Sequence, residues 1–147
     1  MRMRFVYILI LSCLVTAPAH AGIYGDDLSK CLVESTTKQD RTALVRWIFA
    51  AAAANPAVAS LSNVSPKMME DANSTTGALI MRLLTGSCKD KATKALTYEG
   101  PAAIQLSFQV LGQVAGGELF SSPEVRHAIS GLEQYVDKKK LEELRGQ

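Results

Sequence analysis

The segment from Ala43 to Ala54 restricts the fold more than any other part of the sequence. Every residue in it is apolar except Arg46. A helix that is apolar on all sides either lies buried inside a protein or spans a membrane. This segment is much shorter than the roughly 20 residues that a membrane span needs, and it ends at Asn55-Pro56, because the residue before a proline disfavours the helical conformation. We therefore expect a buried helix around Trp47 at the centre of the fold.

Helix-start signals recur along the rest of the chain, whereas strand signals are scarce. Serine followed by proline, at Ser65-Pro66 and at Ser122-Pro123, is typical of a helix start. Apolar residues at three- and four-residue spacing follow both starts, as in an amphipathic helix. The sequence therefore predicts an all-α fold, a compact bundle of five to seven helices around a central apolar helix, in a single domain over residues 22–147.

Two further boundaries follow from local signals. Asp26 or Asp27 is expected to cap a short first helix over residues 28–34, since an aspartate side chain can accept a hydrogen bond from the first turn. Gly116-Gly117 is a candidate break or hinge in the long apolar helix that begins at Ala102.

The first 21 residues have the pattern of a cleavable signal peptide. Arg2 and Arg4 precede an apolar stretch, and Ala19 and Ala21 stand in the Ala-x-Ala arrangement that signal peptidase accepts. The apolar stretch is too short for a permanent membrane anchor. We expect cleavage after Ala21, a mature chain that begins at Gly22, and a periplasmic or secreted location.

The alternative prediction from the same leader is that the protein is a lipoprotein. Ile10-Leu11-Ser12-Cys13 loosely resembles a lipobox, in which Cys13 would be lipidated and become the first mature residue. Leucine just before the small residue fits that pattern poorly, and the apolar run before Cys13 is short for a signal peptide. Cleavage after Ala21 is the better supported of the two predictions.

Removal of the leader leaves a neutral chain with one pair of cysteines. The 16 lysines and arginines fall to 14 when Arg2 and Arg4 are lost, which equals the 14 acidic residues. Because nucleic-acid binding requires an excess of basic side chains, a nucleic-acid partner is not expected. Cys31 and Cys88 are the two cysteines that remain, and a pair in an oxidising compartment predicts one disulfide.

Residues 22–147 contain no recognisable catalytic or metal-binding pattern. His127 is the only histidine there, and Glu124 precedes it by three residues. Di-iron bundles use this Glu-x-x-His spacing twice, together with two further glutamates. Neither a Gly-x-Ser-x-Gly turn nor a phosphate-binding Gly-Lys-Ser or Gly-Lys-Thr motif occurs. We therefore predict no enzymatic activity, no metal and no cofactor.

A binding protein is the hypothesis that remains. Export, small size and the lack of reactive groups favour a module that acts on an exported or cell-envelope protein, for example as a periplasmic immunity or inhibitor protein. Residues next to helix breaks are the candidate partner surface, namely Tyr98, Glu99, Leu119 and Phe120. The alternative is a carrier of a small apolar ligand or lipid within the bundle, which the apolar content of residues 43–54 and 104–114 favours.

Overall fold

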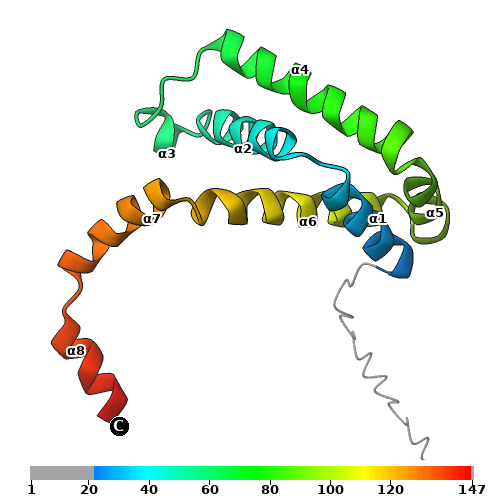
Figure 1. Ribbon diagram of the computed structural model, residues 1–147. Coiled ribbons are helices and arrows are strands. Elements are labelled where there is room, and N and C mark those ends of the chain that lie inside the picture. The colour runs from blue at the N-terminus through cyan, green and yellow to red at the C-terminus, as the bar shows by residue number, and fades with distance from the viewer. Residues whose placement is uncertain (1–21, 147) are drawn as a thin grey trace, which may run out of the picture.

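The computed structural model describes residues 22–146, and this part of the chain is helical with no strands (Figure 1). Within it lie eight α-helices: α1 (Ile23–Glu34), α2 (Lys38–Ala52), α3 (Pro56–Ala59), α4 (Pro66–Arg82), α5 (Lys89–Glu99), α6 (Pro101–Phe120), α7 (Pro123–Ser130) and α8 (Lys138–Glu143). The predicted all-α class is confirmed. Ala19 and Ala21 of the expected cleavage site, and Cys13, lie outside the described residues.

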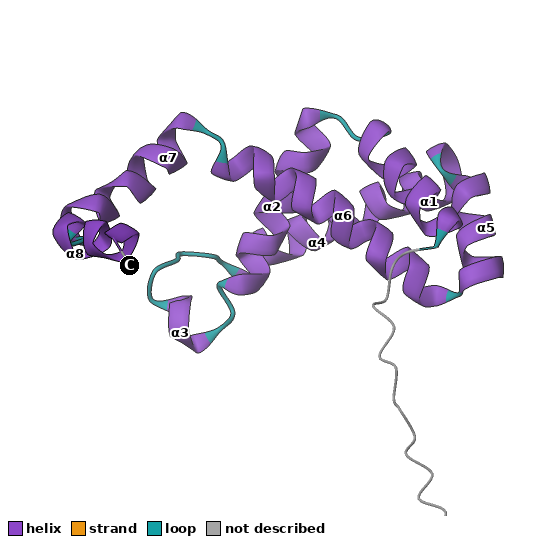
Figure 2. Cartoon of the chain, turned by 90° about the horizontal axis from the view of Figure 1, so that it is seen from below, coloured by secondary structure: helices purple, strands orange, loops and turns teal. Residues whose placement is uncertain are grey.

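Five of these helices form the bundle, which agrees with the predicted range of five to seven. α6 packs against α1, α5 and α2, while α4 lies along the other side of α2 (Figure 1). α3 is a single turn within the long loop between α2 and α4. α7 and α8 continue from the end of α6 and lead away from the bundle, as the view from below also shows (Figure 2).

The core is centred on α1 and α6. Leu28 and Leu32 of α1 are fully buried, as are Leu83 after α4 and Leu111 in α6. Buried alanines on α5 and α6 allow the helices to approach closely around these leucines. The central apolar helix is therefore α6, and it contributes four buried residues along its length.

The alanine-rich helix around Trp47 lies on the flank of the bundle rather than at its centre. Leu44 and Ala50 are the only buried residues of α2, and Phe49 is 59% exposed. The alanines explain this arrangement, because each buries little area and so gains little from a central place. The leucines of α1 and α6 gain more from burial, and they occupy the interior instead.

Local capping signals set most helix starts. Thr37 and Asp40 form a capping box at the start of α2, with each side chain accepting a hydrogen bond from the other residue's backbone N–H. Ser65 and Ser122 cap α4 and α7, and each is followed by proline in the first turn, as predicted. Gly116-Gly117 does not interrupt α6; neither glycine has a positive φ, so both continue the helix.

The first helix begins earlier than predicted. α1 starts at Ile23, so Asp26 and Asp27 lie inside it and neither caps it. Asp27 instead pairs with Lys91 of α5, with 2.9 Å between Oδ2 and Nζ. The hydrogen bond and the charge of Lys91 hold the pKa of Asp27 below its ordinary value. The prediction failed because the group that caps α1 comes from a distant part of the chain, as described below.

Ion pairs connect α2 to both of its neighbours. Nη2 of Arg82, at the end of α4, lies 2.9 Å from Oδ2 of Asp40, and Nε of Arg41 lies 2.8 Å from Oε1 of Glu118 in α6. Desolvation raises the pKa of Asp40, but the hydrogen bonds from Thr37 and Arg82 outweigh it, so that the pKa lies below its ordinary value. Asp40 therefore serves both the start of α2 and the contact with α4.

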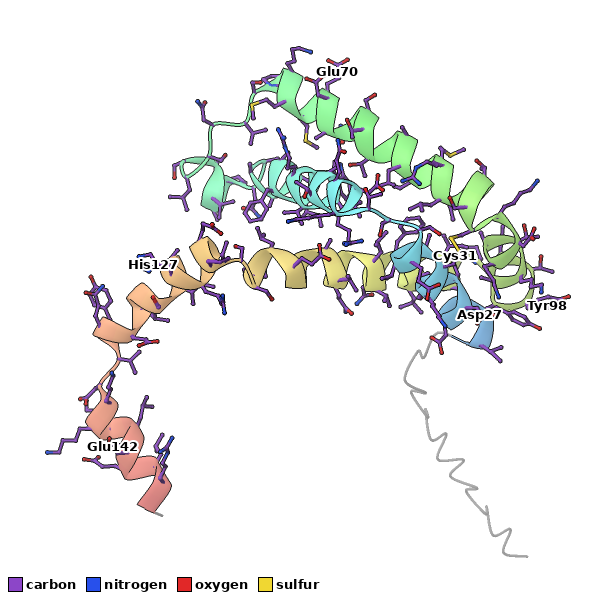
Figure 3. All side chains as sticks on the ribbon, viewed as in Figure 1. Asp27, Cys31, Glu70, Tyr98, His127 and Glu142 are labelled. Atoms are coloured by element: carbon purple, nitrogen blue, oxygen red, sulfur yellow. A yellow bond between two sulfur atoms is a disulfide. The ribbon has the colours of Figure 1, made fainter. Side chains whose placement is uncertain are left out.

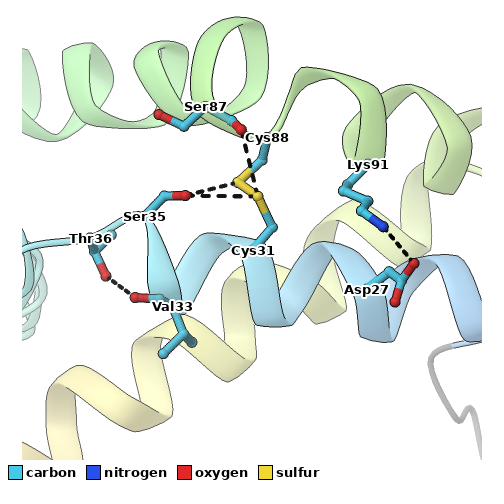
Figure 4. The surroundings of a disulfide bond; sticks show 8 residues. All are labelled: Asp27, Cys31, Val33, Ser35, Thr36, Ser87, Cys88 and Lys91. Carbon is cyan, nitrogen blue, oxygen red and sulfur yellow. Dashed lines mark hydrogen bonds and ion pairs between the residues drawn. A yellow bond between two sulfur atoms is a disulfide. The ribbon is translucent and has the colours of Figure 1, made fainter.

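The predicted disulfide between Cys31 and Cys88 is confirmed. It joins α1 to the start of α5, with an S–S distance of 2.03 Å and a Cα–Cα distance of 5.9 Å (Figure 4). A π-helical turn, Leu83–Ser87, ends the α4 segment and brings Cys88 to α1. Cys88 is buried, and the hydroxyl oxygen of Ser35 lies 3.5 Å from its sulfur. A disulfide of this kind is typical of an oxidising, non-cytoplasmic compartment.

Candidate protein-binding surface

The last part of the described chain extends beyond the bundle. We call residues 123–146, which comprise α7, α8 and two short 3₁₀ turns, the C-terminal arm. α7 contacts the bundle through α6, and every side chain from Arg126 to Arg145 is exposed. Side chains therefore project from the arm on all sides, as at His127 on α7 and Glu142 on α8 (Figure 3). The arm contributes little to the core.

An apolar stripe runs along the first half of the arm. It consists of Val125, Ile129, Leu132 and Tyr135. Val125 and Ile129 are four residues apart on α7, which places them on one face of an α-helix. Leu132 and Tyr135 are three residues apart in the 3₁₀ turn Gly131–Tyr135, where that spacing again gives one face.

The apolar stripe is largely open to solvent. Ile129 is 53% exposed, Leu132 64% and Tyr135 80%, while Val125 is partly buried near the bundle. Single exposed apolar side chains are normal on protein surfaces. A row of them on a helical segment that is exposed beyond its first turn is instead typical of a surface that contacts a partner.

The residues around the apolar stripe carry charges of both signs, including Glu124, Arg126 and Glu133. His127, the histidine next to this stripe, is exposed. Nowhere in residues 22–146 do three or more His, Cys, Asp or Glu side chains gather closely enough to hold a metal ion.

The four residues predicted as a partner surface fall into two pairs at opposite ends of α6. Tyr98 is 67% exposed and its ring stacks on that of Tyr24, with centroids 4.8 Å apart. The carboxylate of Glu99 accepts hydrogen bonds from α1. Leu119 is partly buried, and Phe120, 58% exposed, lies next to the C-terminal arm. α6 has 20 residues, or about 30 Å of helix, and this length separates the two pairs.

The predicted partner surface did not include Ile129, Leu132 and Tyr135. Their spacing was visible in the sequence, but an apolar face of this kind usually packs against the core of its own domain. The signal that distinguishes them is the absence of a covering helix, which depends on the tertiary arrangement. Of the predicted residues, Leu119 and Phe120 at the end of α6 are the nearest to the arm in the sequence.

A cleft lies between α2 and α4. Its volume is about 520 Å³, it is open to solvent on one side, and Arg46 and Asp71 contribute charges to it. Most of its lining is apolar and comes from small side chains with two larger ones, namely Ala43, Phe49, Ala50, Val64, Met68 and Ala72. The volume lies within the range of small-molecule sites.

None of the helices in residues 22–146 combines the length and the apolar character needed to cross a membrane. The chain matches no protein-family model, none of the curated proteins and no solved structure with which it was compared.

Proposed function

We propose that this protein is an exported helical module that binds another exported or cell-envelope protein through its C-terminal arm. The observation that carries the proposal is the apolar stripe, which the described part of the chain leaves uncovered. The disulfide supports a periplasmic or secreted location, since such bonds persist in oxidising compartments. A periplasmic immunity or inhibitor protein is the narrower form of the proposal.

The stripe fits a helix-in-groove contact. In that mode an amphipathic helix inserts apolar anchors, three or four residues apart, into an apolar groove on the partner. Ile129, Leu132 and Tyr135 have this spacing, and tyrosine is common among the residues that dominate binding energy. The protein would then act by covering a functional surface of its partner, without catalysis of its own.

Site-specific photo-crosslinking in the native host tests the proposal. A benzophenone amino acid at residue 132 is expected to give one major crosslinked product with a second protein. The matched control is residue 67, because the side chain of Lys67 on α4 is 80% exposed and lies away from the arm. The proposal is overturned if residues 67 and 132 give the same products, or if residue 132 gives none.

Purified partner then allows a quantitative test. The triple variant I129S/L132S/Y135S is expected to weaken binding by at least about 30-fold, since anchors of this type contribute about 2 kcal/mol or more. The control is Leu61→Ser, because Leu61 is 83% exposed in the loop between α2 and α4. Both variants are expected to keep the helical circular dichroism of the parent, because the substituted side chains are solvent-exposed.

A carrier of a small apolar ligand is the second candidate, and the cleft between α2 and α4 favours it. Native mass spectrometry of the protein from its own host would show a bound molecule of a few hundred daltons. Ala72→Trp is expected to fill the cleft and to abolish that mass, whereas the triple variant of the arm leaves it in place. A stoichiometric second protein in the spectrum supports the first proposal instead.

A further inference from the structure

The N-terminus of α1 is capped by a residue that lies about 75 positions later in the chain. The N-cap residue, Gly22, has no side chain with which to cap the helix. Glu99, the last residue of α5, takes this role: its Oε1 accepts a hydrogen bond from the N–H of Tyr24 and its Oε2 from that of Gly25, both at 2.9 Å. A carboxylate here satisfies two free N–H groups and faces the positive end of the helix dipole.

Gly22 lies directly against the same carboxylate. A Cβ atom at residue 22 would overlap the Oε1 and Cδ atoms of Glu99. The backbone of Gly22, with φ −71° and ψ 179°, is extended and open to any residue, so conformation alone does not require glycine. A side chain at this position would instead move the carboxylate at the flexible end of Glu99 and so disturb its hydrogen bonds to α1.

The predicted cleavage site coincides with this contact. Hydrolysis of the peptide bond between Ala21 and Gly22 consumes one water, releases the leader with a carboxylate on Ala21, and leaves the nitrogen of Gly22 as a free amino group. The pKa of an α-amino group is about 8, so this group is largely an ammonium at neutral pH. Cleavage therefore places a new positive charge one bond, about 1.5 Å, from the Cα of Gly22, whose Cβ position would overlap the carboxylate.

We propose that Glu99 is the receptor for the processed N-terminus, and that the α-ammonium of Gly22 forms an ion pair with its carboxylate. The carboxylate also compensates for the unfavourable placement of a cation at the start of a helix. Signal-peptide cleavage would then complete the fold, because the uncleaved chain has an uncharged amide at this position. This inference rests on the cleavage predicted from the sequence and is independent of any partner.

A double-mutant cycle on the mature protein tests the ion pair. Four chains are compared, beginning at Gly22 or at Ala21, each with Glu99 or with Glu99→Gln. Starting at Ala21 moves the charge one residue away and is expected to lower Tm by about 3 to 6 °C when Glu99 is present. With Glu99→Gln the two starts are expected to have the same Tm. An equal effect of the start in both backgrounds, or no effect in either, overturns the proposal.

Two measurements do not depend on the folding of the Glu99→Gln variant. Acylation of the α-amino group of Gly22 is expected to be at least several-fold slower in the folded chain than in urea, because an ion-paired ammonium is protected. Equal rates in both states overturn the proposal. Protein isolated from the host is expected to begin at Gly22, and a different first residue overturns it as well, because the amino group in question would not exist.

Discussion

The hydroxyl oxygen of Ser107 in α6 lies 2.9 Å from the carbonyl oxygen of Gly25 in α1, and this buried hydrogen bond joins the two helices. Ser107 is completely buried, and its hydroxyl also lies 2.8 Å from the carbonyl oxygen of Ala103, one turn earlier in α6. A buried hydroxyl without a partner would destabilise the fold. The contact therefore satisfies the hydroxyl and allows the backbones of α1 and α6 to pass close to each other.

We expect a small effect of Ser107→Ala and a large one of Ser107→Leu. The alanine removes one hydrogen bond and is expected to lower the free energy of unfolding by about 1 kcal/mol. The leucine is expected to separate α1 from α6, at a cost of about 1–3 kcal/mol or more from overpacking. Urea unfolding followed by circular dichroism measures both. A leucine variant as stable as the parent would show that the two helices are not in close contact.

Gly100 and Gly77 form a matched pair for substitution by alanine. Gly100, between α5 and α6, has φ 82° and ψ −175°. Only glycine adopts this backbone conformation without strain, so Gly100→Ala is expected to reduce stability by about 1–3 kcal/mol. Gly77 lies inside α4, where an added Cβ atom would meet no atom of a neighbouring element within 4 Å. Gly77→Ala is therefore expected to raise stability by about 0.5–1 kcal/mol. Opposite signs of the two Tm shifts confirm the prediction.

Asp40 is expected to contribute to stability at neutral pH and to lose this contribution in acid. Its pKa is lower in the folded chain than its ordinary value of 3.8, so the contribution is complete above that value and disappears as the pH falls through the folded-state pKa. Asp40→Asn should therefore lower Tm at pH 7, and the difference from the parent should shrink below about pH 4. The loss at pH 7 is expected to be about 1 kcal/mol, as for other helix caps.

Asp71→Asn is the control for this pH series. Among the described residues Asp71 pairs with Lys67 of the same helix alone, and both side chains are more than 60% exposed. Removal of such a surface pair is expected to change stability by less than about 0.5 kcal/mol at any pH. If the two variants have the same pH profile, the network of Asp40 with Thr37 and Arg82 does not stabilise the fold.

Loss of the disulfide is expected to destabilise the bundle without abolishing its helices. Cys31 and Cys88 are separated by 57 residues, and a crosslink of this span contributes about 2–4 kcal/mol. The double variant C31A/C88A should therefore unfold at lower urea concentration than the oxidised parent. The parent treated with a reducing agent should match the variant, and a parent unaffected by reduction would contradict the prediction.

The C-terminal arm is expected to exchange its amide hydrogens much faster than the bundle. Its side chains are exposed from Arg126 onward, so its helices lack the tertiary contacts that protect short helices in water. Hydrogen-exchange mass spectrometry should show rapid labelling of residues 126–145 and slow labelling of α1 and α6. A bound partner should slow the exchange around Leu132, and protection in the free protein would indicate that the arm folds back onto the bundle.

The sequence predicts those features of the fold whose causes are local. Ser65 and Ser122 cap helices within three residues of themselves, so their roles could be inferred from neighbouring residues alone. The start of α1 could not, because Glu99 caps it from 75 residues away. The position of the Trp47 helix on the flank of the bundle was not predicted, for a similar reason. Apolar composition shows that a segment can be buried, but it does not show which of several apolar segments will occupy the centre.

Some features of the candidate site could likewise be predicted from the sequence, and others could not. The disulfide was predicted because two cysteines in an oxidising compartment leave a single pairing. The apolar stripe was not predicted as a partner surface. The spacing of Ile129 and Leu132 is the same in a helix that packs on the core of its own domain and in one that does not. Glu99 was selected for its position at a helix break, and its carboxylate is engaged by backbone groups of α1.

The position of the disulfide has a consequence for how the chain responds to proteolysis. The bond between Cys31 and Cys88 closes a covalent ring that contains α2, α3, α4 and the exposed loop that joins them. A single cut in that loop opens the ring but leaves both fragments attached to each other through the sulfur atoms. The molecule can therefore be nicked in this exposed loop and still keep α1, α5 and α6 together in one piece.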